Sequence, residues 1–171
     1  MRVKLRVPLR DFIVLALKKR LYSLYELFQQ FTKEKARSPE QMALIFLDID
    51  YFKVINDTLG HDNGDNLLIH IAKTIKSCLR EGDIAARMGG DEFTIILANM
   101  TSQEQITAAV ELLFRKIAEP ILIEENLIQI TPSMGISIYP KDGKGIHELL
   151  KRADSALYKS KEKGRNQYHF Y

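Results

Sequence analysis

The chain has 171 residues, a length that suits one domain with a sizeable core, and its 46% hydrophobic and 27% charged residues exclude a disordered or fibrous protein. The net charge of +3 is unevenly spread: residues 21–140 hold ten Lys and Arg against seventeen acids, whereas both ends of the chain are basic. A negative centre between basic ends favours a metal-and-phosphate site over a uniform nucleic-acid surface, although solvated surface charge explains most of these residues taken singly.

The first predicted element is a helix near the N-terminus. Its apolar residues step by three and four and form one stripe, namely Val14, Leu17, Leu21, Leu24, Phe28 and Phe31. The pattern is short for a coiled-coil seam, so packing on a sheet is the preferred interpretation. Pro39 interrupts the chain after this helix. We therefore expect residues 1–38 to be an N-terminal helical segment that leads into a globular domain at 39–171.

A buried strand, a polar loop and a second helix follow. The run ALIFLDID (43–50) is mostly apolar and ends in acids, which is typical of a strand buried on both faces. The segment NDTLGHDNGDN (56–66) is rich in Gly, Asn and Asp and predicts a loop. The next helix has a buried side made of Leu67, Leu68, Ile71, Ile75, Cys78 and Leu79.

A hairpin is predicted in the middle of the chain. The runs DIAARM (83–88) and EFTIIL (92–97) flank Gly89 and Gly90, and a two-residue glycine turn is a favoured connection between strands. The later elements are a helix at 106–118, strand candidates around 121–123 and 127–139, a helix at about 146–162, and a closing strand in QYHFY (167–171). Helices mixed with a central hairpin predict an α/β (α+β) sandwich, in which helices flank a central mixed, largely antiparallel sheet.

Three acids at predicted strand ends indicate a metal site. Asp48 ends the buried strand, while Asp91 and Glu92 follow the two glycines. Ligands gather at strand ends in α/β sheets, so the three carboxylates converge if the hairpin lies beside the strand of Asp48. Carboxylates without Cys or a histidine pair favour Mg²⁺ or Mn²⁺ over zinc. A solvated hairpin tip is the alternative, and GGDE alone does not decide between the two.

Three longer stretches of the sequence carry a family resemblance. FLDIDYFKVINDTLGHDNGD (46–65), ARMGGDEF (86–93) and ADSALYKSKEKGRNQY (153–168) resemble the GGDEF-domain family of diguanylate cyclases in order and spacing. The resemblance runs from about Met42 to Tyr171. It implies a fold like that of nucleotidyl cyclases and polymerase palm domains. It also implies condensation of two GTP molecules into cyclic di-GMP, with release of pyrophosphate.

The upstream segment DFIVLALKKRLY (11–22) resembles a degenerate form of the family's D-x-L-T-x-L-x-N-R pattern. Val14 and Lys18 stand where the family usually has Thr and Asn. This departure bears on the placement of the first helix and leaves the expected fold unchanged. The resemblance also implies that two domains face each other as a homodimer, each holding one GTP.

The resemblance implies roles for the acidic residues. Asp48 and Asp91, with the backbone carbonyl of Ile49, resemble the ligands of Mg²⁺ or Mn²⁺. Glu92 resembles a second metal-facing acid or the base that accepts the proton of the 3′-hydroxyl. Asp50, two residues after Asp48 on the same strand face, is expected to support the site from behind the metal ligands.

The resemblance assigns further residues to GTP. Asn56 and Asp65 resemble the guanine-reading pair, and Lys53 with the backbone near Phe52 is placed to meet phosphates. Gly89 and Gly90 let a phosphate come close to the backbone. Lys161 and Arg165 resemble the pair that holds the terminal phosphates. They are four residues apart, and so they lie on one face of the last helix or at its C-terminal exit.

Each of these residues has a structural alternative. Asn56 and Asp65 are also typical of turns and helix caps. Lys161 and Arg165 are also typical of solvated cations at a helix C-terminus. Only the family resemblance favours the functional role over the structural one.

Arg80 and Asp83 form an R-x-x-D motif (REGD) just before the hairpin. Its spacing resembles the family's inhibitory site, where cyclic di-GMP binds away from the active site. Arg can stack on guanine and pair with its acceptors, while Asp accepts its N–H groups. The motif alone is common at helix ends, so it is a hypothesis that depends on the family resemblance.

Three functions stay open at this point: an active diguanylate cyclase, a catalytically silent domain that binds GTP or cyclic di-GMP and regulates a neighbour, and a structural dimerisation domain. The ending GRNQYHFY (164–171) resembles the point where family members continue into an EAL phosphodiesterase domain. Sensor and EAL domains are therefore expected partners in a longer protein, and nucleic acid is not.

Two features bear on the compartment. The single cysteine, Cys78, excludes an internal disulfide framework and suits a reducing environment. No apolar run has the length of a membrane helix, and no signal-peptide core follows the basic start MRVKLRVPLR (1–10). We expect a cytoplasmic domain, in a full-length protein that other segments can tether to a membrane.

Overall fold

The computed structural model describes residues 25–26, 28–29, 32–33 and 40–171. Residues 25–26, 28–29 and 32–33 are helical, whereas the rest of the predicted N-terminal helix, the degenerate 11–22 segment and the expected boundary at residue 38 lie outside the described residues. Phe28 is buried, and its ring packs edge-on against Tyr139, with 5.6 Å between the ring centroids.

A five-stranded sheet in the order β2-β3-β1-β6-β7 forms the centre of the molecule. All neighbours are antiparallel except β6 and β7. The elements in chain order are β1 (Gln41–Ile49), α3 (Phe52–Leu59), α4 (His61–Cys78), β2 (Ile84–Gly89), β3 (Glu92–Met100), α5 (Gln103–Ile117), β4 (Ile121–Ile123), β5 (Asn126–Ile128), β6 (Pro132–Tyr139), α6 (Ile146–Glu162) and β7 (Gln167–Phe170). This architecture confirms the predicted mixed, largely antiparallel sheet flanked by helices.

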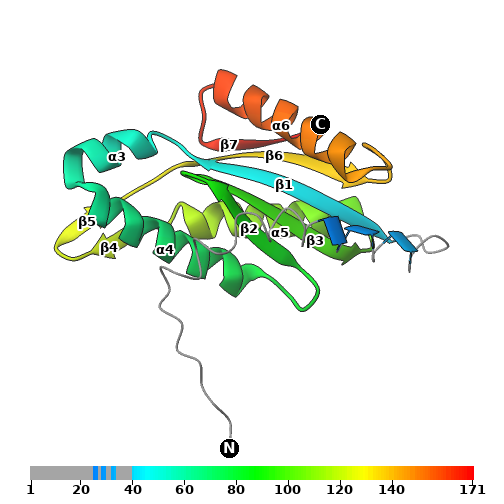
Figure 1. Ribbon diagram of the computed structural model, residues 1–171, viewed down its shortest axis with the longest axis horizontal. Coiled ribbons are helices and arrows are strands. Elements are labelled where there is room, and N and C mark those ends of the chain that lie inside the picture. Colours follow the sequence, from blue (N-terminus) through cyan, green and yellow to red (C-terminus); the bar gives the residue numbers. More distant parts are fainter. Residues whose placement is uncertain (1–24, 27, 30–31, 34–39) are drawn as a thin grey trace, which may run out of the picture.

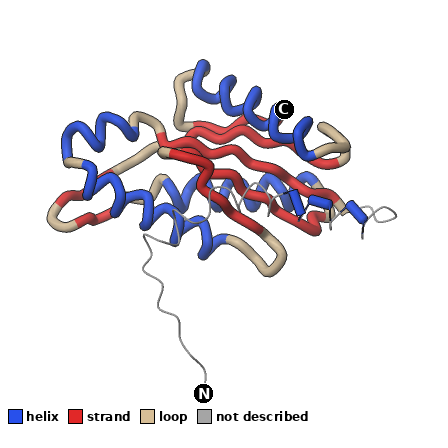
Figure 2. Tube along the Cα trace, in the orientation of Figure 1, coloured by secondary structure: helices blue, strands red, loops and turns tan. Residues whose placement is uncertain are grey.

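Helices cover both faces of the sheet (Figures 1 and 2). Along β1, Ala43, Ile45 and Leu47 belong to the core cluster that includes α4 and α5. Met42 and Leu44 belong to the cluster that includes α6. Side chains alternate between the two faces of a strand, so the even-numbered residues of β1 face α6. Burial on both sides explains the continuous apolar run in the sequence.

Helix α6 packs very closely on β6. A methyl group added at Gly135 would lie 2.1 Å from the carbonyl oxygen of Ala153 and 2.1 Å from the amide nitrogen of Leu157. Only glycine fits between these two backbones. The contact holds the C-terminal half of α6 against the centre of the sheet, so that its side chains reach β1.

The polar segment 56–66 is helical instead of forming the predicted loop. Helices α3 and α4 are separated only by Gly60, whose φ of 84° suits glycine. Asn63 donates a hydrogen bond from Nδ2 to the carbonyl of Leu59 at 2.9 Å, which satisfies the end of α3. The Asn and Asp residues that suggested a loop lie within two consecutive helices, α3 and α4.

The strand predicted at 127–139 is two strands. β5 pairs with β4 in a small separate hairpin, and β6 enters the central sheet only at Pro132. Pro132 begins a strand, a position where its missing N–H is tolerated. The predicted helix at 146–162 and closing strand at 167–170 are confirmed.

Within the part of the chain that the structure describes, no helix has both the length and the apolar character needed to cross a membrane. The predicted free cysteine, Cys78, is half-buried near the end of α4.

Candidate active site

Asp48 lies near the end of β1, on the face that α6 covers. Only 7% of the residue is exposed. Its Oδ2 lies 2.8 Å from Nζ of Lys161, in the last turn of α6. A carboxylate withdrawn from water needs a positive partner or hydrogen-bond donors. The ion pair therefore joins β1 to α6 at this edge of the sheet.

Opposing effects act on the pKa of Asp48. Burial is the largest and raises the pKa of the carboxyl above its ordinary value, while the hydrogen bond and the charge of Lys161 lower it. The negative charges of Asp91 and Glu92 raise this pKa further. Asp91 and Glu92 thus repel the carboxylate of Asp48, and Lys161 offsets part of that repulsion.

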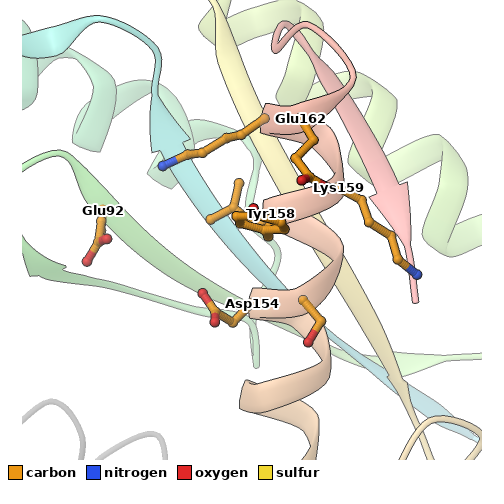
Figure 3. A pocket seen from close by; sticks show the side chains of 8 residues that line it. Glu92, Asp154, Tyr158, Lys159 and Glu162 are labelled. Carbon is orange, nitrogen blue, oxygen red and sulfur yellow. The ribbon is translucent and has the colours of Figure 1, made fainter.

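Glu92 is the first residue of β3 and lies directly opposite Asp48 in the β1–β3 ladder. Partners in a ladder share a sheet face, so Glu92 also faces α6. Figure 3 shows Glu92 across an open pocket from Asp154 and Tyr158 of α6. The pocket has a volume of about 450 Å³ and is lined by Glu92, Asp154, Ser155, Leu157, Tyr158, Lys159, Lys161 and Glu162.

The turn of the hairpin consists of Gly90 and Asp91, because Gly89 still pairs with Glu92 as the last residue of β2. The predicted turn at the two glycines is therefore shifted by one residue, owing to an irregularity in the ladder after Arg87. Gly90 has a φ of 50°, and its carbonyl accepts a hydrogen bond from Nε of Arg87 at 2.7 Å. A Cβ added at either glycine would meet nothing within 4 Å, so open space borders the turn.

The carbonyl of Ile49 is directed toward the hairpin. Asp50 donates its N–H to the carbonyl of Thr131 at 2.9 Å, and so Asp50 and Thr131 are the hydrogen-bonded pair at the end of the β1–β6 ladder. Consecutive residues of a strand direct their backbone groups to opposite sides. The backbone of Ile49 therefore points away from β6, to the side where the Gly90–Asp91 turn lies.

The candidate metal ligands at this edge of the sheet are all oxygen atoms, from carboxylates and one backbone carbonyl, and such ligands suit Mg²⁺ or Mn²⁺. In the ranges 40–171 and the short described stretches before them, no three His, Cys, Asp or Glu side chains form a ready metal-binding cluster. Asp48 instead engages the ammonium of Lys161. The carboxylate thus already attracts a cation, so its chemistry fits a divalent ion.

The start of α3 leaves backbone donors without a side-chain partner. Its N-cap, Tyr51, has a φ of 58° and makes no capping hydrogen bond. The first N–H groups of an uncapped helix form an anion-binding position. Phe52 is buried and anchors this turn, while Lys53 is exposed beside it.

Asn56 and Asp65 are brought together by the contact between α3 and α4. Oδ1 of Asn56 lies so close to Gly64 that a Cβ at Gly64 would be 1.8 Å from it. Gly64 directly precedes Asp65, which is exposed. The predicted guanine-reading pair therefore lies at one junction between two helices, and a glycine makes the approach possible.

Lys161 and Arg165 do not share a helical face. Arg165 lies beyond the end of α6 with a φ of 64°, so the predicted alternative of a helical exit is the one adopted. Its guanidinium carbon lies 5.1 Å from the ring centroid of Tyr51. Its Nε lies 3.9 Å from Oδ1 of Asp50.

Arg80 and Asp83 are adjacent but differ in exposure. The side chain of Arg80 is 53% exposed and that of Asp83 is 2% exposed. The carboxylate of Asp83 accepts hydrogen bonds from the backbone N–H groups of Arg80 and Ala98, both at 2.9 Å. Nη2 of Arg80 lies 2.8 Å from Sδ of Met100. Asp83 therefore has a structural function in addition to any role in ligand binding.

Sequence reasoning gave no role to Arg87 and only a supporting one to Asp50. Arg87 braces the hairpin turn, and Asp50 accepts hydrogen bonds from two segments that are distant in sequence. The sequence indicated the supporting role of Asp50 only through its spacing, because it follows Asp48 by two residues on a strand. Nothing in the sequence marks the residues that it binds.

A model of the family described as diguanylate cyclase, GGDEF domain, matches residues 16–167. The chain is 42% identical over 146 residues to the cyclic di-GMP phosphodiesterase NbdA of Pseudomonas aeruginosa, covering 85% of this chain and 18% of that protein. It is 43% identical over 129 residues to diguanylate cyclase A of Treponema denticola, covering 75% of this chain and 34% of that protein. The chain thus spans only a minor part of the curated relatives it matches.

Two solved structures resemble the fold. The first is an EAL/GGDEF domain protein from M. capsulatus, with a TM-score of 0.72 and 40% identity over 78% of this chain and 86% of that one. The second is the GGDEF domain of DgcB from Caulobacter crescentus in complex with c-di-GMP. Its TM-score is 0.78, with 29% identity over 89% of this chain and 88% of that one.

We expect Lys161→Met to raise the pKa of Asp48 further, because the substitution removes both effects of Lys161 that lower it. An acid whose pKa is raised by folding stabilises the fold at low pH, and this contribution is lost as the pH rises through that pKa. The deficit in unfolding free energy of the variant should therefore grow with pH across this titration. NMR titration of the Asp48 carboxyl carbon and urea unfolding at several pH values measure both quantities.

Lys159→Met is the matched control, because the Nζ of Lys159 lies 5.6 Å from the ring centroid of Tyr171 and does not pair with Asp48. An Asp48 pKa that is the same in Lys161→Met as in the parent would contradict the ion pair.

Proposed function

Since the chain belongs to the GGDEF domain family, which includes diguanylate cyclases and acts in cyclic di-GMP signalling, we propose that it condenses two GTP molecules into cyclic di-GMP and two molecules of pyrophosphate. The observation that carries this proposal is the gathering of Asp48, Glu92 and Lys161 on one sheet face beside an open pocket. Acids, a cation and uncapped helix N–H groups are the parts that phosphoryl-group chemistry requires.

Asp48, Asp91 and the carbonyl of Ile49 are the proposed metal ligands, with Glu92 facing the same ion or accepting the proton of the 3′-hydroxyl. A divalent ion bound there neutralises phosphate charge and polarises the attacked phosphorus. Asp48 and Glu92 hold their relative position through the β1–β3 ladder. Asp91 takes its position from the Gly90 turn that Arg87 braces. The acids are therefore placed by backbone structure rather than by flexible loops.

The triphosphate is proposed to lie between the start of α3 and the end of α6. The backbone at Phe52 and the side chain of Lys53 approach it from one side. Lys161 and Arg165 approach from the other, and Arg165 can engage phosphate oxygens with two N–H groups. If a divalent ion took the place of the lysine ammonium beside Asp48, Lys161 would be able to contact phosphate oxygens instead. Gly89 and Gly90 leave the turn clear for the substrate.

Asn56 and Asp65 are proposed to read guanine. A carboxylate accepts the N–H groups of guanine, and an amide donates to its ring and carbonyl acceptors. Adenine presents a different pattern, so this pair favours GTP over ATP.

A second copy of the domain is required by stoichiometry. One copy offers a single guanine-reading pair, whereas cyclic di-GMP contains two guanines. Each 3′-hydroxyl then attacks the α-phosphate of the GTP held by the facing copy, which positions both reactants within one assembly. The domain is proposed to act as a homodimer, within a longer protein that carries sensor or EAL domains.

A catalytically silent domain that binds GTP or cyclic di-GMP and regulates a neighbour is the second candidate. One relative favours this candidate. NbdA shares 42% of the aligned residues with this chain, and it is named as a cyclic di-GMP phosphodiesterase rather than as a cyclase. The unusual Val14 and Lys18 in the upstream segment point in the same direction.

Product inhibition is proposed to act through Arg80 and Asp83. The side chain of Arg80 is exposed, and its guanidinium can stack on a guanine of cyclic di-GMP. The carboxylate of Asp83 is engaged by the backbone of Arg80 and Ala98, so it orients the motif. Most of the direct contact with the product therefore falls to Arg80.

Asp91→Ala and Glu92→Ala should each lower cyclic di-GMP formation by roughly 100-fold or more, because each removes a carboxylate that stabilises the reacting phosphates through the metal. Concentrated protein is incubated with GTP and Mg²⁺, and the product is measured by chromatography. ATP in place of GTP and EDTA in place of Mg²⁺ should give none. Glu125→Ala, an exposed acid in the β4–β5 turn, is the control.

Full activity in both variants would overturn the metal-site assignment. No product from the parent protein together with Mg²⁺-dependent GTP binding would instead support the silent domain.

Gly64→Ala should weaken GTP binding by about tenfold, because the added methyl group displaces the side chain of Asn56 and so removes a hydrogen bond to the base. The fold should persist, since alanine favours a helix over glycine. Calorimetric titration with GTP measures the affinity. Gly145→Ala, where nothing lies within 4 Å of the new methyl group, is the control. Equal affinities in the two variants would remove Asn56 from the guanine site.

Arg80→Ala should raise the cyclic di-GMP concentration needed for half-inhibition by about tenfold, because a stacked, charge-assisted contact is lost. The initial rate without product should stay the same. Inhibition curves with added cyclic di-GMP measure this, and Lys76→Ala, an exposed cation of α4, is the control. Superimposable curves for Arg80→Ala and the parent protein would exclude the site.

A further inference from the structure

Asp50 is a buried acid to which the proposed chemistry gives no task. Only 4% of the residue is exposed. Its carboxylate accepts hydrogen bonds from Oγ1 of Thr131 and Oγ of Ser133, both at 2.8 Å, and from the backbone N–H of Asn166 at 3.0 Å. Nε of Arg165 completes the surroundings at 3.9 Å. A buried charge with this many donors is held in one orientation.

These contacts join two segments that are far apart in the sequence. Asp50 lies between β1, which ends at Ile49, and the uncapped start of α3. Asn166 belongs to the connection between α6 and β7, and Figure 1 shows this connection at the same end of the sheet as the β1–α3 connection. The carboxylate therefore ties together the two elements proposed to hold the triphosphate.

The connection that Asp50 holds has a strained backbone. Gly164, Arg165 and Asn166 have φ values of 108°, 64° and 48°. Residues other than glycine adopt this left-handed region only when their surroundings compensate for it. The hydrogen bond from the Asn166 N–H to Asp50 and the bond from the Arg165 N–H to the carbonyl of Ser160, at 3.0 Å, supply such compensation.

The side chain of Arg165 is located by the same cluster. Its guanidinium lies near both the carboxylate of Asp50 and the ring of Tyr51, which directly follows Asp50. An arginine that is 40% exposed would otherwise sample many rotamers. Pairing with Asp50 and stacking on Tyr51 limit it to the region beside the start of α3.

We propose that Asp50 is a positioning residue for the triphosphate, which acts by fixing Arg165 and the α6–β7 connection against the start of α3. The proposal rests on the proposed function, since it assumes that GTP binds at this edge of the sheet. Asp50 itself does not touch the nucleotide. Its effect on binding should therefore depend on the presence of Arg165 and on the terminal phosphates.

Asp142 supplies a matched control for a merely structural role. It is 5% exposed, and its Oδ2 accepts a hydrogen bond from the backbone N–H of Ile138 at 2.8 Å. It follows β6, whose last residue, Tyr139, pairs with Met42 at the opposite end of β1 from Asp50. Asp142→Asn is the same chemical change at an equally buried acid, far from the proposed triphosphate.

The experiment measures the affinities of the 171-residue chain for GTP and for GMP, both with Mg²⁺, by calorimetric titration. Asp50→Asn should weaken GTP binding by about tenfold, the effect of losing one interaction with a charged group. GMP binding, which lacks the terminal phosphates, should change by less than about twofold. Asp142→Asn should leave the ratio of GTP to GMP affinity as it is in the parent protein.

A double-mutant cycle separates positioning from general loosening of the fold. If Asp50 acts through Arg165, Asp50→Asn introduced into Arg165→Ala should weaken GTP binding by less than about twofold more. A tenfold loss that persists in the Arg165→Ala background would overturn the proposal, and so would equal losses for GTP and GMP. A parent protein that binds no GTP would refute the proposed function itself, a result distinct from both of these.

Discussion

Two negative charges sit at the end of a strand that is covered on both faces, and much of the domain is arranged around them. Asp48 faces α6 near the end of β1, and Asp50, just after the strand, lies against the α6–β7 connection, so neither has free access to water. Desolvation of a carboxylate costs several kcal/mol unless donors or cations replace the water. The chain meets this requirement in two different ways, and the difference separates the proposed roles of the two acids.

The charge of Asp48 is paired with one lysine side chain, Lys161. The carboxylate of Asp50 is instead held mainly by hydrogen bonds from two hydroxyl groups and a backbone N–H. Lys161 can leave Asp48 at the cost of one ion pair, so the carboxylate can change partners when a cation arrives. The donors to Asp50 are the backbone N–H of Asn166 in the α6–β7 connection and the hydroxyl groups of Thr131 and Ser133 at the start of β6. Asp48 is therefore suited to bind a ligand, and Asp50 is suited to hold the structure that surrounds the ligand.

The same arrangement depends on how closely the helix and the sheet approach each other. Gly135 allows α6 to touch the backbone of β6, and this brings Lys161 within reach of β1. The family assignment rests on nearly the whole chain, residues 16–167, and this range includes both Gly135 and α6. Activity, dimer formation and the partners of a longer protein are proposals, because the chain spans 18% and 34% of the two curated relatives described above.

The sequence by itself determined the class of fold and most residues of the candidate site. Periodicity and residue type can be read directly from the sequence. They predicted the apolar run of β1, the helix at 146–162 and the acids Asp48, Asp91 and Glu92 at strand ends. The resemblance to family motifs was the sole basis for selecting Phe52, Lys53, Asn56 and Asp65. A segment this rich in Asn and Asp also indicates a loop. That ambiguity is why the predicted loop at 56–66 proved to be two helices joined at Gly60.

Only the tertiary structure decided which partner each residue has. Three contacts join segments that no local pattern relates. They are the ion pair between Lys161 and Asp48, the hydrogen bond from Asn166 to Asp50 and the contact of Asn56 with Gly64. The same holds for the one-residue shift of the hairpin turn, which results from an irregularity in strand pairing after Arg87. Pairing, register and close approach are properties of packed elements. They follow from the sequence only through the complete fold.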